Sequence, residues 1–257
     1  MDALTTYRLF SADPQVARSN VSNRPEVARE VEYYSENIGS IKSIDDLMSN
    51  QRIYTFVMQS YGLEDMAYAK AFIRTILEEG SDDTRALANR LSDPRYGELV
   101  EDFNFSRYGT TTTSFDRVTS GTIDKFYQQQ IEREAGSQNN GARLALYFQR
   151  KSDEIEDAYS ILADPALLKF VQTSFGLPIQ MSFQSLEKQA EMIDQRLNIE
   201  DLADPEFMDG LVNRFLASWD IENPDVVSVP PLILSPGGVQ GISQDLLMSL
   251  QNLKSFR

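Results

Sequence analysis

Carboxylates are the most abundant side chains in this sequence that could do chemistry. The 257-residue chain has 39 acidic and 24 basic residues, but no histidine and no cysteine. Without thiols and imidazoles, the composition excludes disulfides, cysteine nucleophiles, Ser-His-Asp triads and most zinc sites. An enzyme of this composition would need two or three carboxylates converging in one pocket, as in glycosidases or divalent-cation sites.

The acidic clusters favour a structural interpretation instead. They are Asp45-Asp46, Glu78-Glu79, Asp82-Asp83, Glu98 with Glu101 and Asp102, and Glu154 with Glu156 and Asp157. These residues stand at expected helix starts or on polar helix faces, where they cap the helix and interact favourably with its dipole. No segment has the alternating acids and central glycine of a calcium loop. We therefore expect solvated helical faces and no metal site.

One four-residue motif matches a catalytic pattern. Ser185-Leu186-Glu187-Lys188 has the Ser-x-x-Lys spacing of penicillin-recognising enzymes, in which the lysine activates the serine. The companion Ser-Asp-Asn and Lys-Thr-Gly motifs are missing, and so is a phosphate-binding Gly-x-x-x-x-Gly-Lys. We predict no catalytic residue and no cofactor site. The single tryptophan, Trp219, is expected in the core.

An internal repeat supplies the elements that would position any site. Residues 43–63 align with residues 157–177 at a constant offset of 114, the distance from position 56 to position 170. The matched pairs are Phe56/Phe170, Val57/Val171, Ser60/Ser174, Tyr61/Phe175, Gly62/Gly176 and Leu63/Leu177. Repeats of this kind are the signature of a duplicated structural unit.

Each copy carries start and stop signals for a helix. Asn50 and Asp164 are expected N-caps, and Pro165 occupies the first helical position, where its missing N–H costs nothing. Gly62 and Gly176 are expected to end the helices in the left-handed conformation. Each is followed by a leucine that packs back over the last turn.

A weaker copy of the unit relates residues 85–103 to residues 198–216, each with a short helix, Asp-Pro and an amphipathic helix. Two long helices are expected between the halves, after a four-threonine loop, and another helix opens near Pro25. No segment alternates as a strand does. The predicted fold class is all-α, with two duplicated halves at about 40–105 and 153–219.

The chain is expected to divide into an N-terminal arm (1–24), an all-α core (25–220) and a C-terminal tail (221–257). The tail contains a segment with four prolines and three glycines, then a short amphipathic helix. Ile242, Leu246, Leu250 and Leu253 form its apolar stripe. This stripe either folds back onto its own domain or binds a partner, and these four residues are the candidate partner-binding residues.

Charge and hydropathy exclude several kinds of partner. The net charge of −15 disfavours nucleic acid, because phosphate binding depends on clustered Lys and Arg. No segment approaches the ~20 apolar residues of a membrane span, so we expect no membrane insertion. The first 20 residues lack the apolar run of a secretory signal. Cytoplasmic residence is the default expectation, although the absence of cysteine also suits a protein that leaves the cell unfolded.

Several segments together resemble an alphaproteobacterial family, a domain of unknown function often encoded among flagellar genes. They are residues 31–34, 37–39, 43–46, SYGLEDMAYAKAFIRTILEEG at 60–80, GARLALYFQRK at 141–151 and SILADPALLKFVQTSFGLP at 160–178. The resemblance covers roughly residues 5 to 256, including the C-terminal GISQDLLMSLQNLK. It supplies no active-site residues. It implies a helical protein associated with flagellar assembly or motility.

The leading hypothesis is a non-enzymatic helical interaction protein whose partners are proteins, flagellar components among them. One alternative is a flagellar export chaperone, which would expose an apolar groove of several hundred Å2. A second alternative is an enzyme of unknown class that uses carboxylates. The sequence leaves the oligomeric state and export through the flagellar apparatus open.

The tail hypothesis predicts that deleting residues 240–257 abolishes partner binding and leaves the thermal midpoint nearly unchanged, because a tethered contact helix adds little to the core. Thermal unfolding and partner co-purification of both forms test this. A large fall in the midpoint would show instead that the helix belongs to the core.

Overall fold

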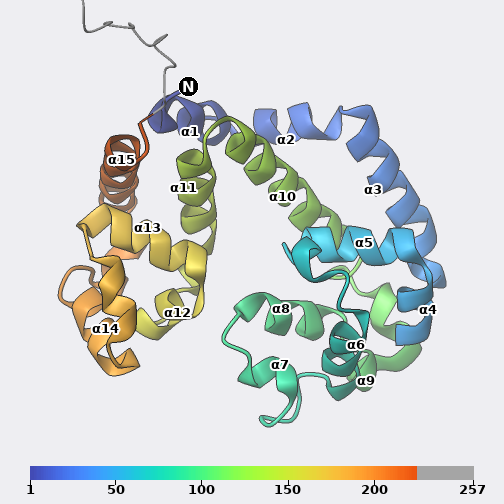
Figure 1. The fold of residues 1–257 in the computed structure, drawn as a ribbon. Coiled ribbons are helices and arrows are strands. Elements are labelled where there is room, and N and C mark those ends of the chain that lie inside the picture. Colours follow the sequence, from blue (N-terminus) through green and yellow to red (C-terminus); the bar gives the residue numbers. More distant parts are fainter. Residues whose placement is uncertain (225–257) are drawn as a thin grey trace, which may run out of the picture. The chain divides into compact units, whose positions relative to one another are not determined.

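The structure, a computed structural model, describes residues 1–224. Within that range every regular element is a helix and none is a strand, which confirms the all-α class (Figure 1). Residues 1–224 include no helix that combines the length and the apolar character needed to cross a bilayer. The predicted tail stripe of Ile242, Leu246, Leu250 and Leu253 lies outside the described residues.

The two halves have the same order of helices. The first half runs through α3 (Pro25–Asn37), η1 (Ile38–Ser40), α4 (Ile44–Ser49), α5 (Gln51–Ser60), η2 (Glu64–Met66), α6 (Lys70–Glu79), α7 (Leu87–Arg90) and α8 (Pro94–Asp102). The second half runs through α11 (Asn140–Lys151), η4 (Ser152–Glu154), α12 (Ala158–Ala163), α13 (Pro165–Phe175), η5 (Ile179–Phe183), α14 (Leu186–Asp194), η6 (Ile199–Ala203) and α15 (Pro205–Glu222). The duplication therefore begins earlier than the sequence comparison indicates.

The remaining helices precede or link the halves. They are α1 (Ala3–Ser11), α2 (Pro14–Ser22), α9 (Phe105–Tyr108), η3 (Gly109–Ser114) and α10 (Ser120–Gln138). The four-threonine run, expected as a loop, forms the single-turn helix η3, and the Thr113 hydroxyl donates to the Ile41 carbonyl at 2.8 Å. Helices α10 and α11 pack against each other, with the break between them at Asn139. These are the two long helices expected between the halves.

The predicted helix ends are confirmed. The Asn50 side chain accepts a hydrogen bond from the Ile53 amide, and Asp164 accepts from the Ala166 and Leu167 amides. Gly62 and Gly176 have φ values of 66° and 62°. The amide of the leucine after each glycine donates a hydrogen bond to a carbonyl in the last helical turn. Leu63 donates to Met58 at 2.8 Å, and Leu177 donates to Gln172 at 2.9 Å.

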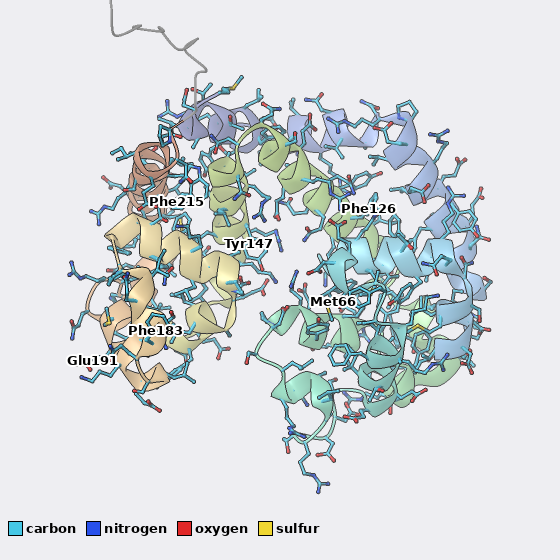
Figure 2. All side chains as sticks on the ribbon, viewed as in Figure 1. Met66, Phe126, Tyr147, Phe183, Glu191 and Phe215 are labelled. Carbon is cyan, nitrogen blue, oxygen red and sulfur yellow. The ribbon has the colours of Figure 1, made fainter. Side chains whose placement is uncertain are left out.

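An equivalent stack of three aromatic rings lies at the centre of each half. Phe56 on α5 lies between Tyr34 and Phe126, with ring centroids 4.3 and 4.1 Å away. Phe170 on α13 lies between Phe148 and Phe215, at 3.8 and 4.3 Å. Figure 2 labels Phe126 and Phe215, the outer rings contributed by α10 and α15.

The predicted N-terminal arm is instead part of the core. Ala3, Tyr7 and Phe10 of α1 are buried, as is Val21 of α2. Helix α1 packs on α11 and α15, and α2 packs on α10. One face of each helix is apolar at helical spacing, so burying that face stabilises the packing. The predicted linker start at 221 is also too early, because α15 continues to Glu222.

The glycines predict opposite stability effects. Gly176→Ala should lower the free energy of unfolding by about 1 to 2 kcal/mol, because a side chain disfavours the left-handed conformation. Gly210→Ala should raise it by about 0.5 to 1 kcal/mol, since Gly210 is inside α15 and nothing lies within 4 Å of the added methyl group. Urea unfolding followed by circular dichroism measures both. Equal effects of the two substitutions would contradict this account of the repeat.

Candidate functional site: a charged pocket between the halves

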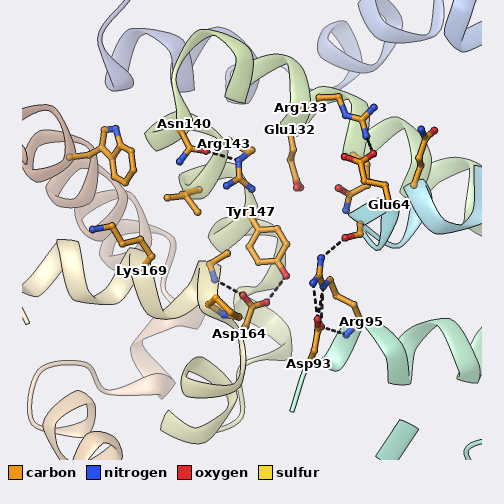
Figure 3. A pocket seen from close by; sticks show the side chains of 17 residues that line it. Glu64, Asp93, Arg95, Glu132, Arg133, Asn140, Arg143, Tyr147, Asp164 and Lys169 are labelled. Carbon is orange, nitrogen blue, oxygen red and sulfur yellow. Dashed lines mark hydrogen bonds and ion pairs between the residues drawn. The ribbon is translucent and has the colours of Figure 1, made fainter. Parts of the chain in front are cut away.

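A pocket of about 630 Å3 lies where the two halves meet. Side chains from α5 and α8 line it on one side, and side chains from α10, α11, α13 and α15 complete the lining (Figure 3). Its charged members are the acids Glu64, Asp93, Glu132 and Asp164 and the bases Arg95, Arg133, Arg143 and Lys169. The pocket therefore combines equal numbers of formal positive and negative charges.

Two of the cations are neutralised by nearby acids. Arg95 forms a bidentate ion pair with Asp93, with Nε to Oδ1 at 3.0 Å and Nη2 to Oδ2 at 2.7 Å. Its Nη1 also donates to the Gly62 carbonyl at the end of α5. Burial disfavours the charged form of Arg95, but the ion pair with Asp93 outweighs burial and raises its pKa. Arg133 pairs with Glu64 across the pocket edge (Figure 3).

The carboxylate of Asp164 is also fully engaged. Besides capping α13, it accepts a 2.5 Å hydrogen bond from the Tyr147 hydroxyl. Burial, together with the adjacent carboxylate, raises the pKa of Tyr147 far above its ordinary value. Tyr147 therefore stays protonated and joins α11 to the start of α13.

The fourth acid, Glu132, is almost completely buried and pairs with Arg150. The Arg150 Nε lies 2.6 Å from the Glu132 carboxylate, and its guanidinium lies over the Tyr147 ring, 4.9 Å from the centroid. Burial lowers the pKa of Arg150, but the interaction with Glu132 more than compensates and raises it overall. This pair joins α10 to α11.

The other end of the pocket has two cations that are paired with acids less closely than Arg95 and Arg133 are. Arg143 makes no ion pair with any residue in the range 1–224, and its Nε donates to the Asn140 Oδ1 at 2.8 Å. The Lys169 Nζ lies 3.6 Å from Glu222 and 5.7 Å from the centroid of the Trp219 ring. Trp219 is 9% exposed, so the expected core residue also lines the pocket.

Two helical glycines make room for this end of the pocket. A β-carbon on Gly141 would lie 2.4 Å from the Trp219 ring, and one on Gly136 would lie 2.8 Å from the Arg143 side chain. Glycine inside a helix costs up to about 1 kcal/mol relative to alanine. At Gly136 and Gly141, the side chains of Arg143 and Trp219 occupy the space that a β-carbon would fill.

A buried charge network adjoins the pocket. Lys125 on α10 contacts Glu98 at 2.8 Å and Asp102 at 2.7 Å, both on α8. Lys151 on α11 contacts Glu98 at 3.2 Å and Glu154 at 2.6 Å. Burial raises the pKa of Glu98, but the two lysines outweigh burial and lower it overall. The network ties α8 of the first half to the helices between the halves.

The acidic clusters of the sequence fall into two groups in the structure, one exposed and one partly buried. Asp45 pairs with the exposed Arg74, and Glu79 and Asp83 accept hydrogen bonds from backbone amides, as expected for caps and solvated faces. The prediction is wrong for Glu98 and Asp102, which lie in the partly buried network. Among residues 1–224 no cluster of three or more acids could hold a metal ion.

The Ser-x-x-Lys motif has a structural explanation. Ser185 is the N-cap of α14, and its hydroxyl accepts a hydrogen bond from the Lys188 amide at 3.5 Å. Both residues are exposed, and neither lines the charged pocket between the halves. The expectation of no catalytic role for this motif remains a prediction.

Sequence reasoning missed Arg95, Arg143, Tyr147 and Lys169. Each stands on a helix whose periodicity suggests an ordinary surface or core position, and the helices α8, α11 and α13 that bring them to one pocket are distant in sequence. A usable signal was the Gly136 and Gly141 pair, because glycine in a helix indicates close packing by a neighbour.

The pKa of Glu98 predicts acid sensitivity. Its folded pKa lies below the ordinary value of 4.5, so ionised Glu98 stabilises the fold above that pH, and the contribution is lost as pH falls through the folded pKa. Glu98→Gln should lower the melting temperature at pH 7, and the difference from the wild type should shrink near pH 3. Glu101→Gln, an exposed neighbour on α8, is the control and should change little at either pH. An equal loss for Glu98→Gln at both pH values would contradict the assigned role.

Comparisons with known proteins relate the chain to one family and to one solved structure. Residues 60–208 match the family model described as "Protein of unknown function (DUF1217)". A crystal structure of a protein from Agrobacterium tumefaciens, determined by the Northeast Structural Genomics Consortium, is 46% identical and has a TM-score of 0.80. The similarity covers 86% of this chain and 94% of that chain. A search among curated proteins finds no match. The chain therefore belongs to the DUF1217 family.

Proposed function

We propose that this chain is a non-enzymatic interaction protein that acts in flagellar assembly or motility by binding other proteins. The observation that supports this most is a pair of exposed aromatic side chains at equivalent positions of the two halves. Tyr68 is 82% exposed and Phe183 is 86% exposed. Aromatic side chains left in water at such positions are typical of binding surfaces.

The equivalence requires one inserted residue in the second half after Leu177, because the preceding repeat has an offset of 114. Met66-Ala67-Tyr68 in the first half and Met181-Ser182-Phe183 in the second stand at an offset of 115, the distance from position 68 to position 183. Both segments follow the glycine-terminated helix and include or adjoin the next single-turn helix. In each, the methionine packs against or within the core while the aromatic ring points into solvent.

The second half has further apolar surface near Phe183. Ile179 at the start of η5 is 71% exposed, and Leu186 at the start of α14 is 59% exposed. Figure 2 labels Phe183 and Glu191 in this region. The exposed side chains Glu187, Glu191 and Asp194 follow at helical spacing along α14. A partner with apolar side chains flanked by basic ones would match this surface.

The pocket chemistry gives less support to the carboxylate-enzyme alternative. General acid catalysis uses a carboxyl group that can take up and release a proton near the working pH. In the pocket, Glu64, Asp93 and Glu132 each face an arginine, and Asp164 caps a helix and binds Tyr147. These partners occupy carboxylate oxygens that a substrate would need.

The flagellar part of the proposal depends on the resemblance of segments such as residues 60–80 and 160–178 to a family often encoded among flagellar genes. Cell fractionation tests it directly. An immunoblot of cytoplasm, purified hook-basal bodies and medium, in wild type and in a flagellar-export mutant, should place the protein with flagellar structures or show export-dependent release. A deletion strain that swims normally, with the protein confined to the cytoplasm of both strains, would contradict the flagellar role.

The exposed aromatic pair makes a sharper prediction. In a deletion strain complemented with variants, Tyr68→Ser and Phe183→Ser should each reduce swimming, and the double variant should abolish it, because each removes a solvent-exposed contact and no core packing. Val16→Ser is the matched control, since Val16 is 53% exposed on α2 and has no such counterpart. Melting temperatures of all four proteins should agree with the wild type. Normal swimming of the double variant would rule out this surface.

A further inference from the structure

We propose that Arg143, Lys169 and Trp219 form a binding site for a carboxylate attached to an apolar group. This inference concerns a ligand of the pocket and does not depend on the proposed function. The three side chains come from α11, α13 and α15, and all three line the pocket between the halves. Figure 3 shows Arg143 and Asn140 together and Lys169 on the neighbouring helix.

The charges of this end of the pocket are not balanced as they are elsewhere. Arg95 and Arg133 have acidic partners, whereas Arg143 has none among residues 1–224 and uses only its Nε in a hydrogen bond. Both terminal amino groups of its guanidinium are left for a ligand. Among residues 1–224, Lys169 pairs with the exposed Glu222, at a distance of 3.6 Å. A planar guanidinium fork is suited to a carboxylate, and Lys169 adds a second positive charge to the same pocket.

The remaining polar groups here are donors. The Asn140 oxygen is occupied by Arg143, so its amide nitrogen is the part left to bind a ligand. The Trp219 indole N–H has no acceptor within the described part of the chain, and indole nitrogen can only donate. The free donors of Arg143, Asn140 and Trp219 require an acceptor, and an anionic acceptor satisfies them best.

The neighbouring acids distinguish a carboxylate from a phosphate. Asp164 and Glu132 line the same pocket, where Asp164 accepts a hydrogen bond from Tyr147 and Glu132 pairs with Arg150. A ligand with two negative charges would be repelled by them, while a single charge balances the free charge of Arg143. Leu144, Pro165 and the Trp219 ring supply apolar contact beside the donors. A monocarboxylate with an aromatic or aliphatic group fits this combination.

The helix glycines indicate that this end of the pocket is a built feature. Gly141 permits the Trp219 ring to lie against α11, and Gly136 permits Arg143 to lie against α10. Alanine at either position would displace one of the two side chains from its place. The same carboxylate could come from a free organic acid or from the C-terminal residue of a peptide, and the experiment below separates these sources.

Intrinsic fluorescence of the full chain provides the readout, because Trp219 is the single tryptophan. The probes are 3-phenylpropionate, its uncharged amide, inorganic phosphate, and an acetylated peptide ending in phenylalanine with either a free or an amidated C-terminus. We expect saturable changes with 3-phenylpropionate and none with its amide. Tighter binding of the free-acid peptide than of 3-phenylpropionate would assign the site to a protein C-terminus. The reverse order would assign it to a small acid.

Arg143→Gln should weaken binding of 3-phenylpropionate by about tenfold or more, the expected loss when one charge-assisted contact is removed. Lys169→Gln should weaken it less. Arg133→Gln is the matched control, because Arg133 lines the same pocket but is committed to Glu64, and it should bind as the wild type does. Gly141→Ala should shift the tryptophan emission before any ligand is added.

Three outcomes would overturn the proposal. They are no saturable change up to about 10 mM probe, equal binding of the acid and its amide, and wild-type affinity in both Arg143→Gln and Lys169→Gln. Tighter binding of phosphate than of 3-phenylpropionate would also overturn the assignment to a carboxylate. Thermal unfolding of each variant establishes that it is folded, and isothermal titration calorimetry gives the affinities independently of the tryptophan.

Discussion

The structure depends on the insertion of one phenylalanine of each repeat between two other rings. Phe56 and Phe170 stand at matching positions of α5 and α13, and each is flanked on both faces. Large aromatic rings stacked in this way bury much apolar surface and accept few alternative geometries. The first ring, Tyr34 or Phe148, comes from the helix that opens each half. The third comes from different elements, α10 in the first half and α15 in the second, so the two cores are closed differently.

The same stacks fix the position of the pocket. Phe126 anchors α10 to the first half, and Arg133 stands seven residues further along that helix, close to the same face. Phe148 anchors α11 to the second half, and Tyr147 and Arg143 precede it on that helix. Because α10 and α11 pack on each other, fixing one ring on each helix fixes which side chains face one another at the junction. The pocket charges are therefore placed by core packing on both sides.

Short sequence patterns predicted where helices begin and end. The Asp-Pro caps, Gly62 and Gly176 are each decided by a few neighbouring residues, and the structure confirms them. The relation between α3 and α11 was missed, although Ala28/Ala142, Arg29/Arg143, Tyr33/Tyr147 and Tyr34/Phe148 stand at the same offset of 114, because the residues between these matches differ. The pocket could not be predicted, since partners such as Arg133 and Glu64 are 69 residues apart. Burial of α1 was missed for the same reason, since its contacts are on α11 and α15.

The N-terminus of α1 is hydrogen-bonded to a residue near the end of the described chain. The Ala3 amide at the start of α1 donates to both oxygens of Asp220, each at 3.1 Å and 217 positions away. Contacts this distant in sequence form late, because most of the chain must be present before they can close. During synthesis on the ribosome, α1 therefore leaves the exit tunnel long before its packing surface on α15 exists. Its apolar face stays open to chaperones, or to any factor that recognises unfolded chains, until α15 has been translated.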